Sequence, residues 1–180
     1  NTEIQLRELT DKNIFTQPFW VNQKIWFPIE NKEAIRKDFD FSKDDYLVGS
    51  FQRDTESADF KSPKLEKGPD IFFKIVSEIN KDKKNLLVVL TGKNRQYLIE
   101  KFTQHHIRYK YFEMIDQKKM NQLYNILNLY IVSSRVEGGP QSILECSAVN
   151  TPIISTDVGI ASKILHTESI YSDDYKLAKP

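Results

Sequence analysis

The stretch NLLVVLTGKNRQYLIEKFTQHHIRYKYF, residues 85–112, decides the fold class. It opens with NLLVVLT, a continuous apolar run that is typical of a strand buried on both faces of a parallel sheet. The next segment, KNRQYLIEKFTQHH, is predicted to be a helix, and IRYKYF is predicted to be a second strand. A strand, a helix and a strand in this order indicate a right-handed crossover between parallel strands.

The same alternation continues in both directions along the chain. Upstream, DYLVGSF (45–51) is a predicted strand, and PDIFFKIVSEINKD (69–82) is a predicted helix with one apolar stripe. Downstream follow helix DQKKMNQLYNILN (116–128), strand LYIVSS (129–134), a helix at the Gly-Gly-Pro segment, strand TPIIST (151–156), helix VGIASKILH (158–166) and a short strand SIYS (169–172). The alternation predicts an α/β fold, a single Rossmann-like, doubly wound parallel sheet over residues 45–180.

Residues 1–44 have a different character. They are predicted to form a connecting, aromatic-rich segment that packs on the domain, with a short helix at NKEAIRKDF, residues 31–39. Its most prominent aromatic residues are Phe19, Trp20, Trp26 and Phe27. Packing is the favoured role for these rings, stacking on a ligand is the alternative, and covering a neighbouring domain is a third interpretation.

The composition argues against several classes of protein. The 26 basic and 25 acidic residues leave a net charge of +1, so no basic field favours nucleic acid. Cys146 is the only cysteine, which excludes an internal disulfide and a cysteine-based zinc site and fits a cytoplasmic protein. No apolar run approaches the roughly 20 residues of a membrane span. Because the start, NTEIQLRELT, neither begins with Met nor resembles a signal peptide, we expect the chain to be part of a longer protein.

Functional residues are expected at one edge of the predicted sheet. In doubly wound sheets, ligands bind beyond the carboxyl ends of the strands. The loops at those ends follow Phe51, Thr91, Phe112, Ser134 and Thr156.

The loop after the strand LYIVSS reads RVEGGPQSILE, residues 135–145. Pro140 is predicted to be the first residue of a helix, and Gly138 and Gly139 allow close approach of a ligand to the backbone. The free N–H groups and the dipole of the helix start suit an anionic or hydroxyl-rich group.

Two carboxylates, Glu137 and Glu145, bracket this Gly-Gly-Pro break. Because helical side chains lean toward the N-terminus, Glu145 is expected to point back to the loop that holds Glu137. Two acceptor-only groups at one pocket suit vicinal hydroxyls, as in a sugar or a ribose. The alternatives are that both are solvated charges, or that they form an acid/base pair of the glycosidase type.

A basic loop follows the first strand of the predicted sheet. Arg53 begins it, and Lys67 closes it as Lys67-Gly68-Pro69 at the next helix. The guanidinium of Arg53 can make a two-pronged contact and the ammonium group of Lys67 a single one, and together they suit a diphosphate. The alternative is that they are ordinary charged residues of a polar loop.

Two glycines and three histidines complete the candidates. Gly92 and Gly159 follow strands and are candidates for close backbone approach. His105, His106 and His166 show no metal-ligand pattern with carboxylates, so no metal site is expected.

Taken in order, these segments resemble the C-terminal, donor-binding domain of GT-B glycosyltransferases, specifically the retaining family 4. The resemblance rests on the E-x7-E signature EGGPQSILE followed by TPIISTDVG, on VGSFQRD and LEKGPDIFFKIV, and on NLLVVLTG and YNILNLYIVSSRVEGGP. It covers roughly residues 45–166.

The resemblance implies a role for each matching residue. Glu137 would contact hydroxyls of the donor sugar, Glu145 would contact the ribose, and Arg53 and Lys67 would hold the diphosphate. The other implied donor-binding residues are Gly49, Gly92, Gly138, Gly139, Pro140, Gln141 and Ser142, together with Phe112 and Met114 near the nucleobase.

Two departures from the family pattern affect these implied roles. Arg53 stands four residues beyond Gly49, whereas many relatives have arginine immediately after this glycine. Glu113 replaces the usual glycine after the third strand.

The implied activity is retaining, metal-independent transfer of a hexose-type sugar from a nucleotide diphosphate to a glycan or lipid acceptor, in cell-surface polysaccharide biosynthesis. No cofactor is expected. The acceptor site would come from an N-terminal domain that this chain lacks, so the isolated chain is predicted to transfer no sugar. Peripheral membrane association through absent regions fits this interpretation. The rival interpretations are a non-catalytic sugar- or nucleotide-binding scaffold and a GT-B sugar-nucleotide epimerase.

Overall fold

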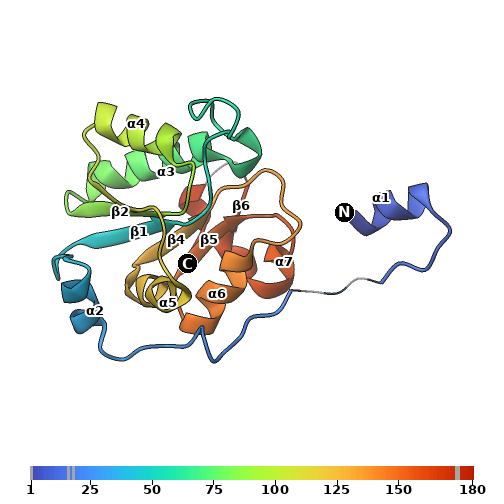
Figure 1. The fold of residues 1–180 in the computed structure, drawn as a ribbon, viewed down its shortest axis with the longest axis horizontal. Coiled ribbons are helices and arrows are strands. Elements are labelled where there is room, and N and C mark those ends of the chain that lie inside the picture. Colours follow the sequence, from blue (N-terminus) through green and yellow to red (C-terminus); the bar gives the residue numbers. More distant parts are fainter. Residues whose placement is uncertain (1, 16, 18, 173–174) are drawn as a thin grey trace.

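The protein was studied as a computed structural model, which describes residues 2–15, 17, 19–172 and 175–180. Within these residues, six parallel strands form one sheet in the order β3-β2-β1-β4-β5-β6 (Figure 1). The strands are β1 Tyr46–Ser50, β2 Leu86–Thr91, β3 Tyr109–Phe112, β4 Leu129–Val132, β5 Ile153–Thr156 and β6 Ile170–Tyr171. The predicted doubly wound parallel sheet is therefore confirmed.

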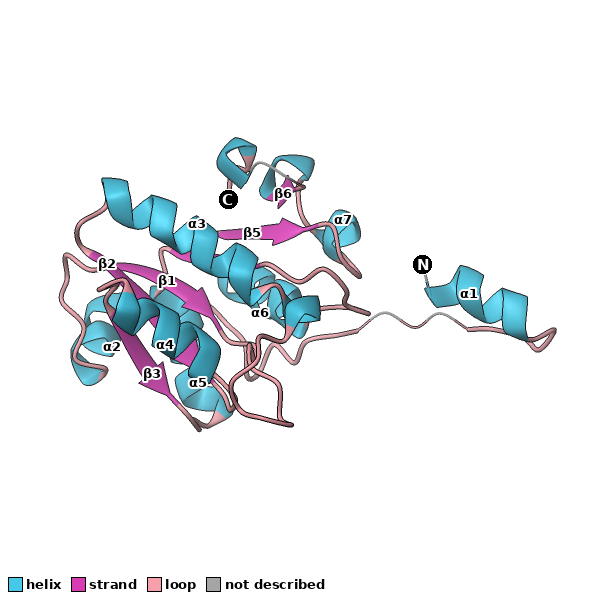
Figure 2. Cartoon of the chain, turned by 90° about the horizontal axis from the view of Figure 1, so that it is seen from above, coloured by secondary structure: helices cyan, strands magenta, loops and turns pink. Residues whose placement is uncertain are grey.

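Helices cover both faces of the sheet (Figures 1 and 2). One face is packed by α3 Pro69–Asp82 and α4 Gln96–Gln104, and the other by α2 Lys32–Asp38, α5 Gln117–Ile126 and α6 Gln141–Val149. Neighbouring strand residues alternate between the two cores: Leu47 packs with the α5 and α6 side, and Val48 with the α3 and α4 side. The apolar run of β2 is buried throughout, as expected for a strand covered on both faces.

The order of the strands reverses at the centre of the sheet. β1 pairs with β2 on one side and with β4 on the other. Successive crossovers therefore run away from β1 in both directions, which opens a crevice beyond the carboxyl ends of β1 and β4. The loops that follow Ser50 and Val132 meet here, where Ser134 Oγ donates to Gln52 Oε1 at 3.1 Å.

Several predicted helix boundaries are wrong, and α4, for example, begins at Gln96 rather than at Lys93. Helix α6 begins at Gln141 because Pro140 has an extended ψ of 115° and occupies the N-cap position. Helix α7 covers only Ala161–Ile164 instead of residues 158–166, since Gly159 has a left-handed φ of 57° and Leu165 an extended ψ of 152°. Hydrophobic periodicity reveals neither the left-handed backbone conformation of a glycine nor the end of a single-turn helix.

The N-terminal segment has two parts. Helix α1, Thr2–Leu9, lies apart from the sheet in both views (Figures 1 and 2). Further along, Trp26 is buried in the α5 and α6 core, and the backbone N–H of Ile29 donates to Asn125 Oδ1 at 2.7 Å. Phe19 and Trp20 remain exposed. The division into residues 1–44 and 45–180 stays a prediction.

Candidate functional site

A hollow of about 230 Å³ lies at the central crevice, between the end of β1 and the start of α6. Six of the predicted site residues line it: Glu137, Gly139, Pro140, Gln141, Ser142 and Glu145. The two carboxylates of the E-x7-E segment therefore face one hollow, as their spacing predicts.

The start of α6 offers unused hydrogen-bond donors to this hollow. The backbone N–H of Ile143 already donates to the Pro140 carbonyl at 3.1 Å. The N–H groups of Gln141 and Ser142 have no acceptor among the residues that the structure describes. Two free donors at the positive end of a helix are suited to an anionic group.

Glu145 is held by an aromatic hydroxyl. The Tyr124 hydroxyl donates to Glu145 Oε2 at 2.8 Å. Burial raises the pKa of Glu145, and the hydrogen bond from Tyr124 opposes this effect. Tyr124 and Tyr130 also line the hollow, together with Phe51.

Glu137 is held by charge. Lys67 Nζ contacts Glu137 Oε1 in an ion pair, and both side chains are mostly buried, with 23% and 16% of their surface exposed. Ser134 Oγ lies 3.2 Å from the same carboxylate oxygen. Gln52 connects the two sides, because its Nε2 donates to the Lys67 carbonyl at 2.9 Å and its Oε1 lies 3.1 Å from Ser134 Oγ. Lys67 is thus joined to the hollow through Glu137.

Backbone packing fixes the Lys67 loop against the Glu137 loop. Gly68 has a φ of 60°, and a Cβ at this position would overlap the Ser133 carbonyl oxygen. The backbone N–H of Arg135 donates to the Glu66 carbonyl at 2.8 Å. The Arg135 guanidinium also binds both oxygens of the Asp70 carboxylate, at 2.8 and 2.6 Å. The position of Lys67 opposite Glu137 therefore depends on close contact between two loops.

Arg53 lies apart from this group. Its side chain is exposed and has no hydrogen bond or ion pair within the described part of the chain. The next residue, Asp54, is buried, and its Oδ2 lies 2.8 Å from Nε of Arg95, whose side chain is 0% exposed. Burial lowers the pKa of Arg95 and raises the pKa of Asp54, whereas their mutual attraction opposes both shifts. This buried pair fixes the start of the basic loop and leaves Arg53 pointing to solvent.

The remaining predicted donor-binding residues do not line the hollow. Gly49 lies inside β1, where a side chain would overlap Leu127. Gly92, with a φ of 84°, lies at the end of β2 and donates its N–H to the Phe112 carbonyl at 3.2 Å. The Phe112 ring packs in the core, Met114 is 72% exposed, and the space beside Gly138 is open. Gly159 approaches the backbone of Gly138 and Gly139, so its close contact is internal.

Sequence reasoning missed five residues of this site. Phe51, Gln52, Tyr124 and Tyr130 line the hollow, and Arg135 connects its two loops. Tyr124 and Tyr130 fall inside ordinary helix and strand patterns, and Gln52 and Arg135 are ordinary polar loop residues. No local signal separates them from their neighbours.

Two kinds of feature are absent from residues 2–15, 17, 19–172 and 175–180. No group of three or more His, Cys, Asp or Glu side chains there is arranged to hold a metal ion. No helix there is long and apolar enough to cross a membrane. Metal independence remains a prediction.

Comparisons with known proteins agree with this fold. The sequence profile of glycosyl transferases group 1 matches residues 31–170. Sucrose-phosphate synthase from Thermosynechococcus elongatus is 19% identical, with a TM-score of 0.70 over 98% of this chain and 44% of that protein. HepE from Anabaena, in complex with UDP-glucose, is 16% identical, with a TM-score of 0.67 over 88% and 44% of the two chains.

A third solved structure is itself a C-terminal domain. The C-terminal domain of the group 1 glycosyltransferase LpcC from Francisella tularensis is 16% identical, with a TM-score of 0.63 over 83% of this chain and 76% of that one. No curated protein sequence matches the chain significantly.

The chain spans less than half the length of sucrose-phosphate synthase and of HepE. At these identities, the solved structures show a shared fold. The family profile covers well over half of the 180 residues. The resemblance noted in the sequence is therefore confirmed: the chain belongs to the group 1 glycosyltransferases and has the fold of the C-terminal domain of a GT-B enzyme.

Proposed function

We propose that this chain is the donor-binding domain of a retaining, metal-independent glycosyltransferase that transfers a hexose-type sugar from a nucleotide diphosphate to a glycan or lipid acceptor. The observation that supports this most is the single hollow that Glu137, Glu145 and the α6 start share. Lys67 adds a cation beside the same hollow through its ion pair with Glu137. Such a combination matches a ligand with hydroxyls at two points and negative charge between them.

Each group in the hollow has a part in donor binding under this proposal. The carboxylate of Glu145 accepts the ribose hydroxyls, and that of Glu137 accepts hydroxyls of the sugar. The diphosphate lies against the free N–H groups of Gln141 and Ser142. Because Lys67 is paired with Glu137, the incoming diphosphate competes with this carboxylate for the cation.

Catalysis follows from charge that is in place before the reaction. As the sugar leaves, negative charge grows on the diphosphate and positive character grows on the sugar ring. Lys67 and the α6 N–H groups stabilise the departing diphosphate, and Glu137 lies where it can stabilise the sugar. Such fixed dipoles and charges accelerate the reaction only to the extent that their interaction strengthens in the transition state. Arg53 acts as a second cation on the diphosphate if its loop moves toward the hollow.

The acceptor and the cellular role are further parts of the proposal. The acceptor site belongs to the portion of the protein that this chain does not include, since the chain spans 44% of HepE and of sucrose-phosphate synthase. We place the enzyme in cell-surface polysaccharide biosynthesis in the cytoplasm, peripheral to the membrane. The donor-binding role is supported by HepE, whose structure was solved with UDP-glucose.

The test is a transfer assay with the full-length protein and a panel of UDP- and GDP-hexoses, followed by NMR of the anomeric signals. We expect a product whose anomeric configuration matches that of the donor, and no transfer by the 180-residue chain alone. An inverted product would contradict the retaining mechanism. Isomerised donor without an acceptor would indicate an epimerase, and no binding of any nucleotide would indicate a scaffold.

A further inference from the structure

Glu145 has an unusual environment for a carboxylate in a site for charged ligands. Burial and the hydroxyl of Tyr124 from α5 act on its pKa, and Glu145 in turn raises the pKa of Tyr130 from β4 and of Cys146 on its own helix. None of these is a cation, and across residues 2–15, 17, 19–172 and 175–180 Glu145 has no ion-pair partner. A half-buried carboxylate without a cation depends on hydrogen bonds to remain ionised.

The Tyr124 hydroxyl supplies the single such bond to the Glu145 side chain within the described part of the chain. It donates to Oε2 at 2.8 Å and leaves Oε1 without a protein partner there. Oε1 is thus the carboxylate oxygen that can still accept hydrogen bonds from ligand hydroxyls with both of its lone pairs.

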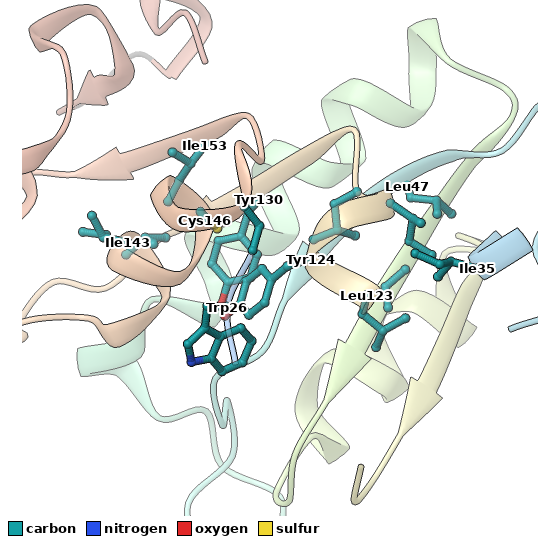
Figure 3. Close-up of a cluster of buried hydrophobic side chains, with 14 of the residues drawn as sticks. Trp26, Ile35, Leu47, Leu123, Tyr124, Tyr130, Ile143, Cys146 and Ile153 are labelled. Carbon is teal, nitrogen blue, oxygen red and sulfur yellow. The ribbon is translucent and has the colours of Figure 1, made fainter. Parts of the chain in front are cut away.

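Tyr124 is held rigidly in place. Its side chain is 1% exposed, and Thr151 Oγ1 donates to its backbone carbonyl at 2.7 Å. The ring contacts Phe51 and Trp26 edge-on, with centroid distances of 4.8 and 5.6 Å, and Tyr130 at 5.3 Å. Figure 3 shows Trp26, Tyr124 and Tyr130 grouped within the α5 and α6 core. A ring packed on three sides can move its hydroxyl very little.

Trp26 lies outside the part of the chain that matches the family profile, residues 31–170. Its burial against Tyr124 therefore connects the N-terminal segment to the hollow.

We propose that Tyr124 is a positioning residue for the donor site, whose hydroxyl holds Glu145 as a carboxylate with Oε1 open to the ribose, and that Trp26 packs Tyr124 in place. This proposal rests on the proposed function, because it assigns a partner to the residue that binds the ribose there.

The proposal has a consequence for the pH dependence of binding. Burial raises the pKa of Glu145, and loss of the Tyr124 hydrogen bond removes the effect that opposes this rise. Tyr124→Phe therefore moves the protonation of Glu145 to higher pH. A protonated carboxyl is a poorer hydrogen-bond acceptor than a carboxylate. As pH is lowered, the variant therefore loses nucleotide affinity at a higher pH than the wild type does.

The experiment is calorimetric titration of the full-length protein with UDP and with GDP, from mildly acidic to mildly alkaline pH. The variants are Tyr124→Phe, Glu145→Gln and the control Tyr171→Phe. Tyr171 is also buried, and its hydroxyl donates to the Val132 carbonyl at 2.8 Å, but it does not line the hollow. Both tyrosine variants thus lose one buried hydrogen bond, and only one of them loses it at Glu145.

We expect Tyr124→Phe to weaken binding of the preferred nucleotide about tenfold near neutral pH and to move the pH midpoint of binding upward. Glu145→Gln is expected to weaken binding and to lose the pH dependence, while Tyr171→Phe matches the wild type. Trp26→Phe, which keeps the hydroxyl but loosens the ring, is expected to shift affinity in the same direction by less. If Tyr124→Phe folds poorly, calorimetric titration of Trp26→Phe tests the proposal in its place.

Equal affinity and an equal pH midpoint for Tyr124→Phe and Tyr171→Phe would overturn the proposal. The same holds if Tyr124→Phe does not fold and Trp26→Phe binds like the wild type. Failure of the proposed function looks different, because the wild type would then bind neither UDP nor GDP.

Discussion

The two glutamates of the hollow are alike in sequence and different in structure. Glu137 is paired with a cation, Lys67, in a contact formed by two loops. Glu145 lies on a helix, has no ion-pair partner in the described chain, and is held by the neutral hydroxyl of Tyr124. The Glu137 end is therefore held by charge and loop packing, and the Glu145 end by a rigid aromatic core.

This difference matches two different tasks. Under the proposed function, the cation at the Glu137 end is shared with an incoming diphosphate, so an ion pair that a ligand can compete for is useful. At the Glu145 end, the proposed function requires a carboxylate that accepts ligand hydroxyls from a fixed direction, and the packed ring of Tyr124 supplies this direction. The cost at this end is the partial desolvation of a carboxylate that has no cationic partner in the described chain.

The largest expected effect concerns the loop contact at the Glu137 end. Gly68→Ala introduces a side chain at a φ of 60° and against the Ser133 carbonyl. We expect a loss of about 4 kcal/mol in the free energy of unfolding, from left-handed strain and overlap together, measured by urea denaturation. Gly138→Ala is the matched control, because no atom beyond its two chain neighbours lies within 4 Å of its Cβ position. Similar losses for both variants would show that the loop contact has no special role.

The next effect concerns the shared cation. Lys67→Met keeps the length of the side chain and removes its charge, so we expect kcat/KM of the full-length enzyme to fall by an amount equivalent to about 3 kcal/mol. Because Glu137 is then left without its cation, a modest loss of stability is expected as well. Initial rates over a range of donor concentrations measure the effect, and an unchanged kcat/KM would remove Lys67 from the mechanism.

The third prediction separates the two glutamates by the sign of their effect on stability. Burial raises the pKa of Glu145, so the folded protein holds its proton to higher pH than the unfolded chain. The free energy of unfolding therefore falls as pH rises from the pKa of Glu145 in the unfolded chain to its higher pKa in the folded protein. Glu145→Gln removes this cost and is expected to gain about 1 kcal/mol in the free energy of unfolding at neutral pH, while donor binding is weakened.

Glu137→Gln has the opposite expected sign, since it breaks the ion pair with Lys67 and loses up to about 1 kcal/mol. Urea unfolding at neutral pH measures both variants. If both are destabilised equally, the contrast between the two ends of the hollow fails.

The smallest expected effect concerns the Arg135–Asp70 pair. Both side chains are about two-fifths exposed, so solvent screens the pair and we expect a coupling of only about 0.5 kcal/mol. A double-mutant cycle with Arg135→Gln and Asp70→Asn measures this coupling. A coupling far above this value would mean that the Arg135–Asp70 ion pair, rather than the Gly68 contact, holds the two loops together.

Much of this site could be predicted because its signals are local. A glycine before a helix-starting proline at Gly68-Pro69, and two glutamates at a fixed spacing, express backbone geometry and helix direction within a few residues. Helix α3 begins and ends at the predicted residues for the same reason. The alternation of apolar strands and helices likewise predicts the sheet.

The remainder depends on contacts between distant segments. Tyr124 is 21 residues from Glu145, and Gln52 is 82 residues from Ser134, so neither contact leaves a pattern in the sequence. Arg95 falls in a segment that was predicted to be an ordinary helix, yet its side chain is buried beside Asp54. Such pairings become visible only after the sheet brings the loops together.

The most direct test of the central claim is a crystal structure of the full-length protein with UDP bound. The account predicts that the ribose hydroxyls lie within hydrogen-bond distance of Glu145 Oε1. The diphosphate is expected at the N–H groups of Gln141 and Ser142, with Lys67 turned from Glu137 toward the phosphate. UDP bound at another edge of the sheet, or bound here with Glu145 still free of the ribose, would contradict it.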